Sequence, residues 1–89
     1  MAYFFGRVSL GDYAKFREIF DSKEDMRQAA GATKSTVYQS VDDPNEIVVQ
    51  IQFPTADAAK AFSTSEGLRN AIQQAGAKEP PRMVIANET

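Results

Sequence analysis

The sequence predicts an α+β fold in which four β-strands form one antiparallel sheet and all the helices cover one of its faces. Two β-rich segments, 37–41 and 46–53, flank a turn-forming cluster, as they do in a β-hairpin. An amphipathic helical pattern precedes the hairpin and another follows it, and strand patterns lie at both ends of the chain. The resulting order, β-α-β-β-α-β, is typical of a sheet with helices on one side only.

Composition and charge fit one small domain, residues 1–89, with 43% hydrophobic and 25% charged residues. A chain of this length buries a modest share of its surface, so oligomerisation would add useful burial. The net charge is −2 and no basic cluster is present, so nucleic acid and anionic membranes are not expected partners. No apolar run approaches the roughly 18 residues of a membrane span, and the start lacks a signal-peptide pattern. We therefore expect a cytoplasmic protein.

The missing residue types limit the chemistry that the chain can perform. It has no cysteine and no histidine, which removes thiolate nucleophiles, the commonest general base and the commonest transition-metal ligand. Asp42 and Asp43 stand beside Pro44 and Asn45, a grouping more typical of a tight turn than of a cation site. We therefore expect no catalytic residue, no bound metal and no cofactor.

The first strand is predicted from Ala2 to Val8, with Gly6 marking a bulge or a close approach of backbone. Asp12 then predicts the N-cap of a helix. Apolar side chains recur within that helix at helical spacing, namely Tyr13, Phe16, Ile19 and Phe20.

A break in this first helical region is expected near Asp21 and Ser22. Ser22 followed by Asp25 resembles a capping box and predicts a second short helix through Ala30, ended by Gly31. On that helix, the charged residues Glu24, Asp25 and Arg27 are interpreted as a solvated face.

The hairpin should place one apolar and one half-polar face on the sheet. Within 46–53 the side chains alternate, with Ile47, Val49, Ile51 and Phe53 on one face and Glu46, Val48, Gln50 and Gln52 on the other. A turn at 42–45 predicts the pairs Val41 with Ile47, Gln39 with Val49 and Val37 with Ile51. This register gathers Thr36, Tyr38, Gln50 and Gln52 on the helix-free face.

The second helical region is also expected in two parts. Thr55 and Ser65 are the predicted N-caps, and Gly76 the predicted end. The second part carries an apolar stripe that should face the sheet, formed by Leu68, Ala71, Ile72 and Ala75. Two prolines at 80–81 exclude helix, so residues 82–87 are predicted as the last strand.

This order of elements is that of ferredoxin-like folds, and what covers the helix-free face separates the functional hypotheses. The RNA-recognition module has the same order and stacks bases on aromatic residues of its sheet. Here the strand at 46–53 has no basic residue and no aromatic residue before Phe53, and the chain is acidic, which disfavours RNA binding.

Several motifs resemble a known family. The segment 12–16 reads Asp-Tyr-Ala-Lys-Phe, the segment 42–45 reads Asp-Asp-Pro-Asn, and Phe53 ends a strand before an alanine-rich helix. The segment 65–76, Ser-Glu-Gly-Leu-Arg-Asn-Ala-Ile-Gln-Gln-Ala-Gly, precedes the proline pair. Together they resemble the dimeric α+β barrel superfamily, in particular its small antibiotic-biosynthesis-monooxygenase-like and cyclase-like members.

The resemblance implies a homodimer in which two sheets pack face to face around a cavity that holds a small, often aromatic molecule. Active members commonly use histidine, tryptophan or asparagine in that cavity, and this chain has no histidine and no tryptophan. The fold and the dimer are therefore carried over from the resemblance, and catalysis is not.

Four residues are candidates for binding a ligand between the sheets. Tyr38, Gln50 and Gln52 could donate or accept hydrogen bonds, and Arg7 could bind a carboxylate or phenolate. Alternatively, they form a polar patch where two sheets meet, with Arg7 paired to an acid of the same sheet.

Three functions stay open. The favoured one is a homodimer that binds a small organic ligand. The others are a cofactor-free monooxygenase or cyclase acting on an aromatic substrate, and a structural or interaction dimer that holds no ligand. The sequence leaves open whether the chain is an enzyme.

Overall fold

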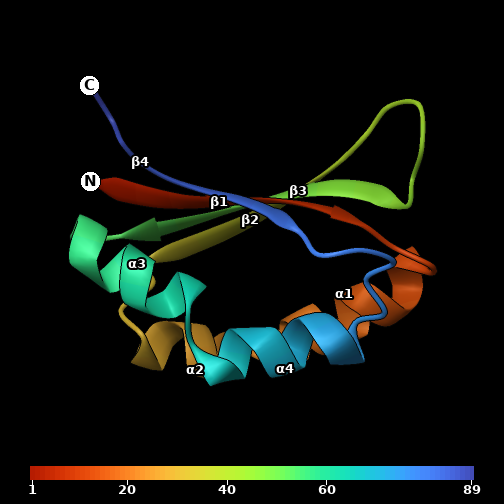
Figure 1. Cartoon of the computed structure of the whole chain (residues 1–89), viewed down its shortest axis with the longest axis horizontal. Coiled ribbons are helices and arrows are strands. Elements are labelled where there is room, and N and C mark those ends of the chain that lie inside the picture. The colour runs from red at the N-terminus through yellow and green to blue at the C-terminus, as the bar shows by residue number, and fades with distance from the viewer.

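The computed structural model describes all residues from Met1 to Thr89 and has the predicted order of elements, with each helical region divided in two (Figure 1). The strands are β1 (Ala2–Ser9), β2 (Lys34–Gln39), β3 (Glu46–Phe53) and β4 (Arg82–Asn87). The helices are α1 (Tyr13–Ser22), α2 (Glu24–Ala29), α3 (Ala56–Ser63) and α4 (Glu66–Gln74). None of these helices has the length and hydrophobicity needed to cross a membrane.

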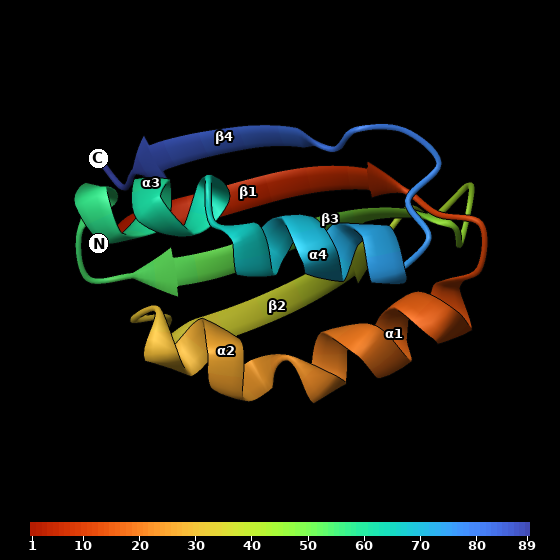
Figure 2. The same cartoon turned by 60° about the horizontal axis from the view of Figure 1, so that its bottom comes forward.

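The four strands form one antiparallel sheet in the order β2-β3-β1-β4. Figure 1 shows this sheet edge-on with all four helices on one side of it. In Figure 2, α3 and α4 lie over the middle of the sheet, while α1 and α2 run along its β2 side. The predicted α+β, ferredoxin-like architecture with one helix-free sheet face is confirmed.

The core lies between the sheet and the helices. Its apolar side chains come from alternate positions of β1 and β3, as the period-two pattern predicted, and from α1 and α3. Phe62 of α3 packs its ring edge against Phe4 and its tilted ring against Phe53, both at 5.4 Å between centroids. Burying a side chain of this size contributes about 1.5–3 kcal/mol, so this aromatic group holds α3 on the sheet.

The predicted hairpin register is wrong by two residues. The observed pairs are Gln39 with Ile47, Val37 with Val49 and Ser35 with Ile51. The loop is longer than expected, because the N–H of Ser40 bonds the carbonyl of Glu46 at 2.8 Å and Val41 is 99% exposed, outside the strand. A shift by an even number of residues preserves the faces, so the predicted apolar and polar sides are confirmed.

Three of the four predicted N-caps are confirmed. Asp12, Thr55 and Ser65 accept hydrogen bonds from backbone N–H groups two or three residues later. The predicted cap at Ser22 is wrong. Its hydroxyl donates to a carbonyl of α1 three residues earlier, and Lys23 begins α2 without any side-chain cap.

Gly6 is not at a bulge, contrary to one of the two predictions for it. It pairs with Val49 and Met83 in an uninterrupted register. A Cβ atom there would lie 3.1 Å from the ring of Phe4, so the missing side chain leaves room for that ring. Apart from Gly6 and its two chain neighbours, no backbone atom lies within 4 Å of that position, so the predicted close approach of backbone is also wrong, and it is a side chain that requires the glycine.

Candidate functional site

The helix-free sheet face carries all four predicted ligand residues, and the structure pairs two of them, Tyr38 and Gln50, with each other. The Tyr38 hydroxyl donates to Oε1 of Gln50 at 3.1 Å, and Nε2 of Gln52 donates to the Tyr3 hydroxyl at 3.4 Å. Tyr3 itself donates to Glu88 at 2.9 Å, and this acceptor raises the pKa of its phenol. These polar groups thus already have partners within the chain.

Arg7 lies on the same face but belongs to a separate ion pair. Its Nε donates to Oε1 of Glu46 at 2.6 Å, and Oε2 of Glu46 accepts from the Ser9 hydroxyl at 2.7 Å. The hydrogen bond from Arg7 and then that from Ser9 hold the pKa of Glu46 below its ordinary value. Val48 occupies the position between Arg7 and Tyr38 across the sheet. The alternative interpretation of Arg7, as the partner of an acid of the same sheet, is confirmed.

Apolar side chains share this helix-free face. Val84 of β4 is 59% exposed, and Val48 and Tyr38 are also exposed. The half-buried rings of Tyr3 and Phe5 stack at 5.8 Å between centroids. The face is therefore a mixed apolar and polar surface without a helix to cover it.

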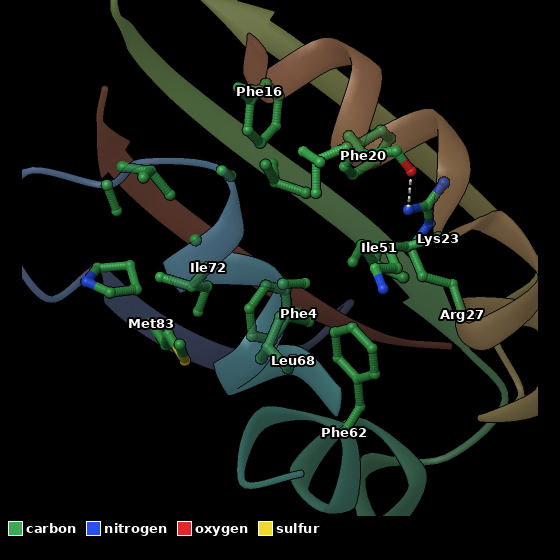
Figure 3. A pocket seen from close by; sticks show the side chains of 18 of the residues that line it. Phe4, Phe16, Phe20, Lys23, Arg27, Ile51, Phe62, Leu68, Ile72 and Met83 are labelled. Carbon is green, nitrogen blue, oxygen red and sulfur yellow. Dashed lines mark hydrogen bonds between the residues drawn. The ribbon is translucent and has the colours of Figure 1, made fainter. Parts of the chain in front are cut away.

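A second candidate site is a cavity of about 70 Å³ on the other side of the sheet, between β-strands and helices (Figure 3). Fifteen of its nineteen lining residues are hydrophobic. The large ones labelled in Figure 3 are Phe4, Phe16, Phe20, Ile51, Phe62, Leu68, Ile72 and Met83. The predicted stripe on α4 forms one wall, which confirms that this stripe faces the sheet side.

Small residues keep this cavity from being filled. Gly6 of β1, Ala71 of α4 and Ala75, the C-cap of α4, all line it, where larger side chains would occupy the space. An engineered apolar cavity of about 150 Å³ holds benzene, so a ring of that size enters here only if lining side chains move. The unbranched thioethers of Met26 and Met83 line the cavity and are the side chains best able to do so.

Two cations, Lys23 and Arg27, line the α1–α2 end of the apolar cavity. Arg27 is only 6% exposed, which makes its interpretation as part of a solvated helix face wrong. Its Nη1 donates to the Phe20 carbonyl at 2.6 Å and its Nε to the Ser35 hydroxyl at 3.2 Å. The guanidinium also lies 3.7 Å from the centroid of the Phe20 ring. Burial lowers the pKa of Arg27, but an arginine remains protonated at neutral pH.

Sequence reasoning placed the site on the helix-free face and missed this cavity. One signal for it was present: residues 16, 20, 23 and 27 follow one another at helical spacings of four, three and four. If the helical spacing is continued across the expected break, Lys23 and Arg27 fall on the same core-facing side as Phe16 and Phe20.

Comparison with solved structures shows the same fold over nearly the full length. A structure from Bordetella bronchiseptica, described under the name antibiotic biosynthesis monooxygenase, has a TM-score of 0.84 at 15% identity, covering 99% of this chain and 96% of that one. SnoaB, a cofactor-independent oxygenase from Streptomyces nogalater, has a TM-score of 0.80 at 16% identity, covering 99% of this chain and 92% of that one. At these identities the likeness establishes the fold alone.

The sequence comparisons establish the family to which the chain belongs. Among curated proteins, none matches the chain. The family model described as antibiotic biosynthesis monooxygenase matches residues 3–74, most of the chain, and agrees with the resemblance seen in the sequence. This chain therefore belongs to the antibiotic biosynthesis monooxygenase family.

Proposed function

We propose that this chain binds a small apolar ring molecule in the cavity between its sheet and its helices, and that it works as a homodimer. An unfilled volume between the sheet and the helices, lined by fifteen hydrophobic residues, supports this function most strongly. Protein interiors are close-packed, so an unfilled apolar hollow between the sheet and the helices of so small a protein calls for a reason.

The lining has the character of a ligand site. Sites for small molecules are concave and mostly apolar, with a few polar groups that fix the orientation of the ligand. Here the apolar walls come from the sheet and from α1 and α4, and the polar groups are the cations Lys23 and Arg27. The aromatic rings of Phe16 and Phe20, tilted at 5.5 Å between centroids, offer a surface against which a flat ring can pack.

The helix-free face supports the dimer. Exposed apolar side chains such as Val48 and Val84 beside the polar pair Tyr38 and Gln50 suit a contact between two copies. A stable interface of this kind buries roughly 1,200–2,000 Å².

In such a dimer, the predicted ligand residues Arg7, Tyr38, Gln50 and Gln52 would lie between the two sheets. Because each already has a partner within its own chain, their arrangement favours polar contacts at an interface. A ligand between the sheets stays a prediction, as does the cytoplasmic location.

Oxygenation of an aromatic substrate without a cofactor is the second candidate function. It is favoured by the family and by the fold shared with SnoaB, which is named as a cofactor-independent oxygenase. Oxygen consumption with a panel of quinols and aromatic polyketides would test it. Uptake that a cavity-filling substitution abolishes would support an enzyme, and no uptake above a protein-free control would leave a binding protein.

The binding proposal is tested by titrating the chain with naphthalene-2-carboxamide, a neutral ring compound. The protein has no tryptophan, so the naphthyl fluorescence is free of tryptophan emission. Ala71→Phe should abolish binding because Ala71 lines the cavity, whereas Gln74→Phe on the exposed side of the same helix should not. Equal binding by both variants, each shown to be folded by circular dichroism, would contradict the proposal.

A further inference from the structure

The charges at one end of the cavity point to a narrower class of ligand. Building on the proposed function, we propose that the ligand is a ring molecule that carries a carboxylate, and that Arg27 and Lys23 bind this carboxylate at the α1–α2 end of the cavity. The ring would then extend toward α4, where Leu68 and Ile72 form the wall.

Arg27 is a buried cation without an ion-pair partner. The two ion pairs of the structure join Arg7 with Glu46 and Arg17 with Asp21, and neither includes Arg27. Removing a charge from water is costly unless the charge is paired. Arg27 is 6% exposed and has no carboxylate within 4.0 Å, so a bound anion would supply the ion-pair partner that the chain does not.

The nearby acids do not supply that anion. Glu24 and Asp21 favour the charged form of Arg27 from a distance, so they partly offset the effect of burial on its pKa. Asp21, however, is engaged by Arg17 at 3.3 Å. The guanidinium donates through Nε and Nη1 to the protein, and Nη2 donates to no protein group. The fork of an arginine suits a carboxylate, which can accept from two nitrogens at once.

The position of Arg27 fits a ligand with one apolar and one charged end. It lines the apolar cavity and also a polar hollow of about 310 Å³ at the surface, whose lining includes the cations Arg17 and Lys34 and the acids Asp21 and Glu24. Figure 3 shows Lys23, Arg27 and Phe20 together on one side of the cavity, with Met83 on the other. A carboxylate at Arg27 would keep access to water while its ring occupies the apolar part.

A purely structural role for Arg27 must be separated from this one. Through the Phe20 carbonyl and the Ser35 hydroxyl, Arg27 ties α2 to the end of α1 and to β2. Lys23 plays no part in that connection, because its ammonium group makes no hydrogen bond and no ion pair. Lys23 is thus the residue whose replacement tests anion binding with little risk to the fold.

The experiment compares naphthalene-2-carboxylate with naphthalene-2-carboxamide, two probes of nearly the same shape that differ in charge. Dissociation constants would be measured for the wild type, Lys23→Met, Arg27→Gln and the control Lys15→Met, an exposed lysine on α1 outside the cavity. We expect the wild type and Lys15→Met to prefer the carboxylate by about tenfold or more, the scale of a charge-assisted hydrogen bond. Lys23→Met and Arg27→Gln should lose most of that preference, because their affinity for the carboxylate falls further than their affinity for the carboxamide.

The titrations distinguish a failure of the carboxylate site from a failure of the whole cavity site. Equal affinity of the wild type for both probes, with Ala71→Phe blocking both, would overturn the carboxylate site and leave the cavity site standing. A preference that survives in Lys23→Met and Arg27→Gln, or that Lys15→Met also removes, would overturn it as well. Binding of neither probe would refute the proposed function and this inference with it. If Arg27→Gln does not fold, Lys23→Met alone decides.

Discussion

At the scale of single residues, the neighbour of a charged side chain decides what that side chain does. Glu46 has Arg7 and Ser9 within hydrogen-bond distance, and its carboxylate is stabilised. Arg27 has a carbonyl, a hydroxyl and an aromatic ring but no carboxylate within ion-pair distance. The first arrangement completes an ion pair on the sheet, and the second is the basis for the carboxylate site that we propose.

The Arg7–Glu46 pair predicts a pH dependence of stability. Because the pKa of Glu46 is lowered in the folded chain, the pair stabilises the fold above the ordinary glutamate pKa of about 4.3 and loses this effect as the pH falls below it. Glu46→Gln should therefore show a smaller drop in unfolding free energy between neutral and acidic pH than the wild type, measured by urea denaturation. Glu18→Gln, an exposed acid without a hydrogen bond or ion pair, is the control and should follow the wild type. Parallel profiles for Glu46→Gln and wild type would contradict the assignment.

Truncating the cavity wall should lower stability without destroying the fold. Leu68 is half-buried, so Leu68→Ala is expected to cost about 2 kcal/mol, the low end for a core leucine. The same change enlarges the cavity, and the affinity for a larger ring should rise relative to that for naphthalene-2-carboxamide. Thermal unfolding and parallel titrations measure the two effects. An unchanged melting temperature would mean that Leu68 does not pack against the core.

The helix caps could be predicted from the sequence, whereas the burial of Arg27 could not. The caps at Asp12, Thr55 and Ser65 are local: each side chain bonds a backbone group two or three positions away. The burial of Arg27 depends on contacts with Phe20 and Ser35, which the fold brings together. No local pattern specifies those contacts, although the spacing of residues 16, 20, 23 and 27 runs across the predicted break, which the structure confirms between α1 and α2.

At the scale of elements, alternation predicted the strands and their faces, whereas the loop decided the register. The pattern of β3 fixes which side chains point to the helices, but it is equally compatible with pairings two residues apart. The bonds inside the loop, including that from the N–H of Asn45 to the Asp43 carboxylate at 2.9 Å, set the observed register. These bonds belong to a particular loop conformation that composition does not determine.

The contact between Gly67 of α4 and Met26 of α2 should control the space available in the cavity. A Cβ atom on Gly67 of α4 would lie 2.7 Å from the sulfur of Met26, so Gly67→Ala must displace the Met26 side chain, which lines the cavity. The gain from replacing a helical glycine, up to about 1 kcal/mol, offsets the cost of that displacement, so stability should change little. Binding of naphthalene-2-carboxamide should weaken as the thioether moves into the cavity.

A double variant controls for this effect. Adding Met26→Ala to Gly67→Ala removes the displaced side chain and should restore binding. If Gly67→Ala binds the probe as well as the wild type does, then the α2–α4 contact does not control the size of the cavity.

At the scale of the whole molecule, the helix-free face predicts self-association. Light scattering should give twice the chain mass at micromolar concentration, because the exposed apolar side chains of this face are then covered. Val84→Asp would place a charge in the interface and should shift the mass toward that of a monomer. Val41→Asp, in the fully exposed loop, is the matched control and should remain dimeric. A monomeric wild type would remove the basis for a barrel built from two sheets.

Nuclear Overhauser effects between a bound probe and the protein methyl groups test whether the ligand lies beneath the helices, as we propose. With naphthalene-2-carboxamide bound to a methyl-labelled chain, we expect contacts to Ile51, Leu68, Ile72 and Met26, which line the cavity. Contacts confined to Val48 and Val84 on the helix-free face would contradict it and would place the ligand between the sheets instead.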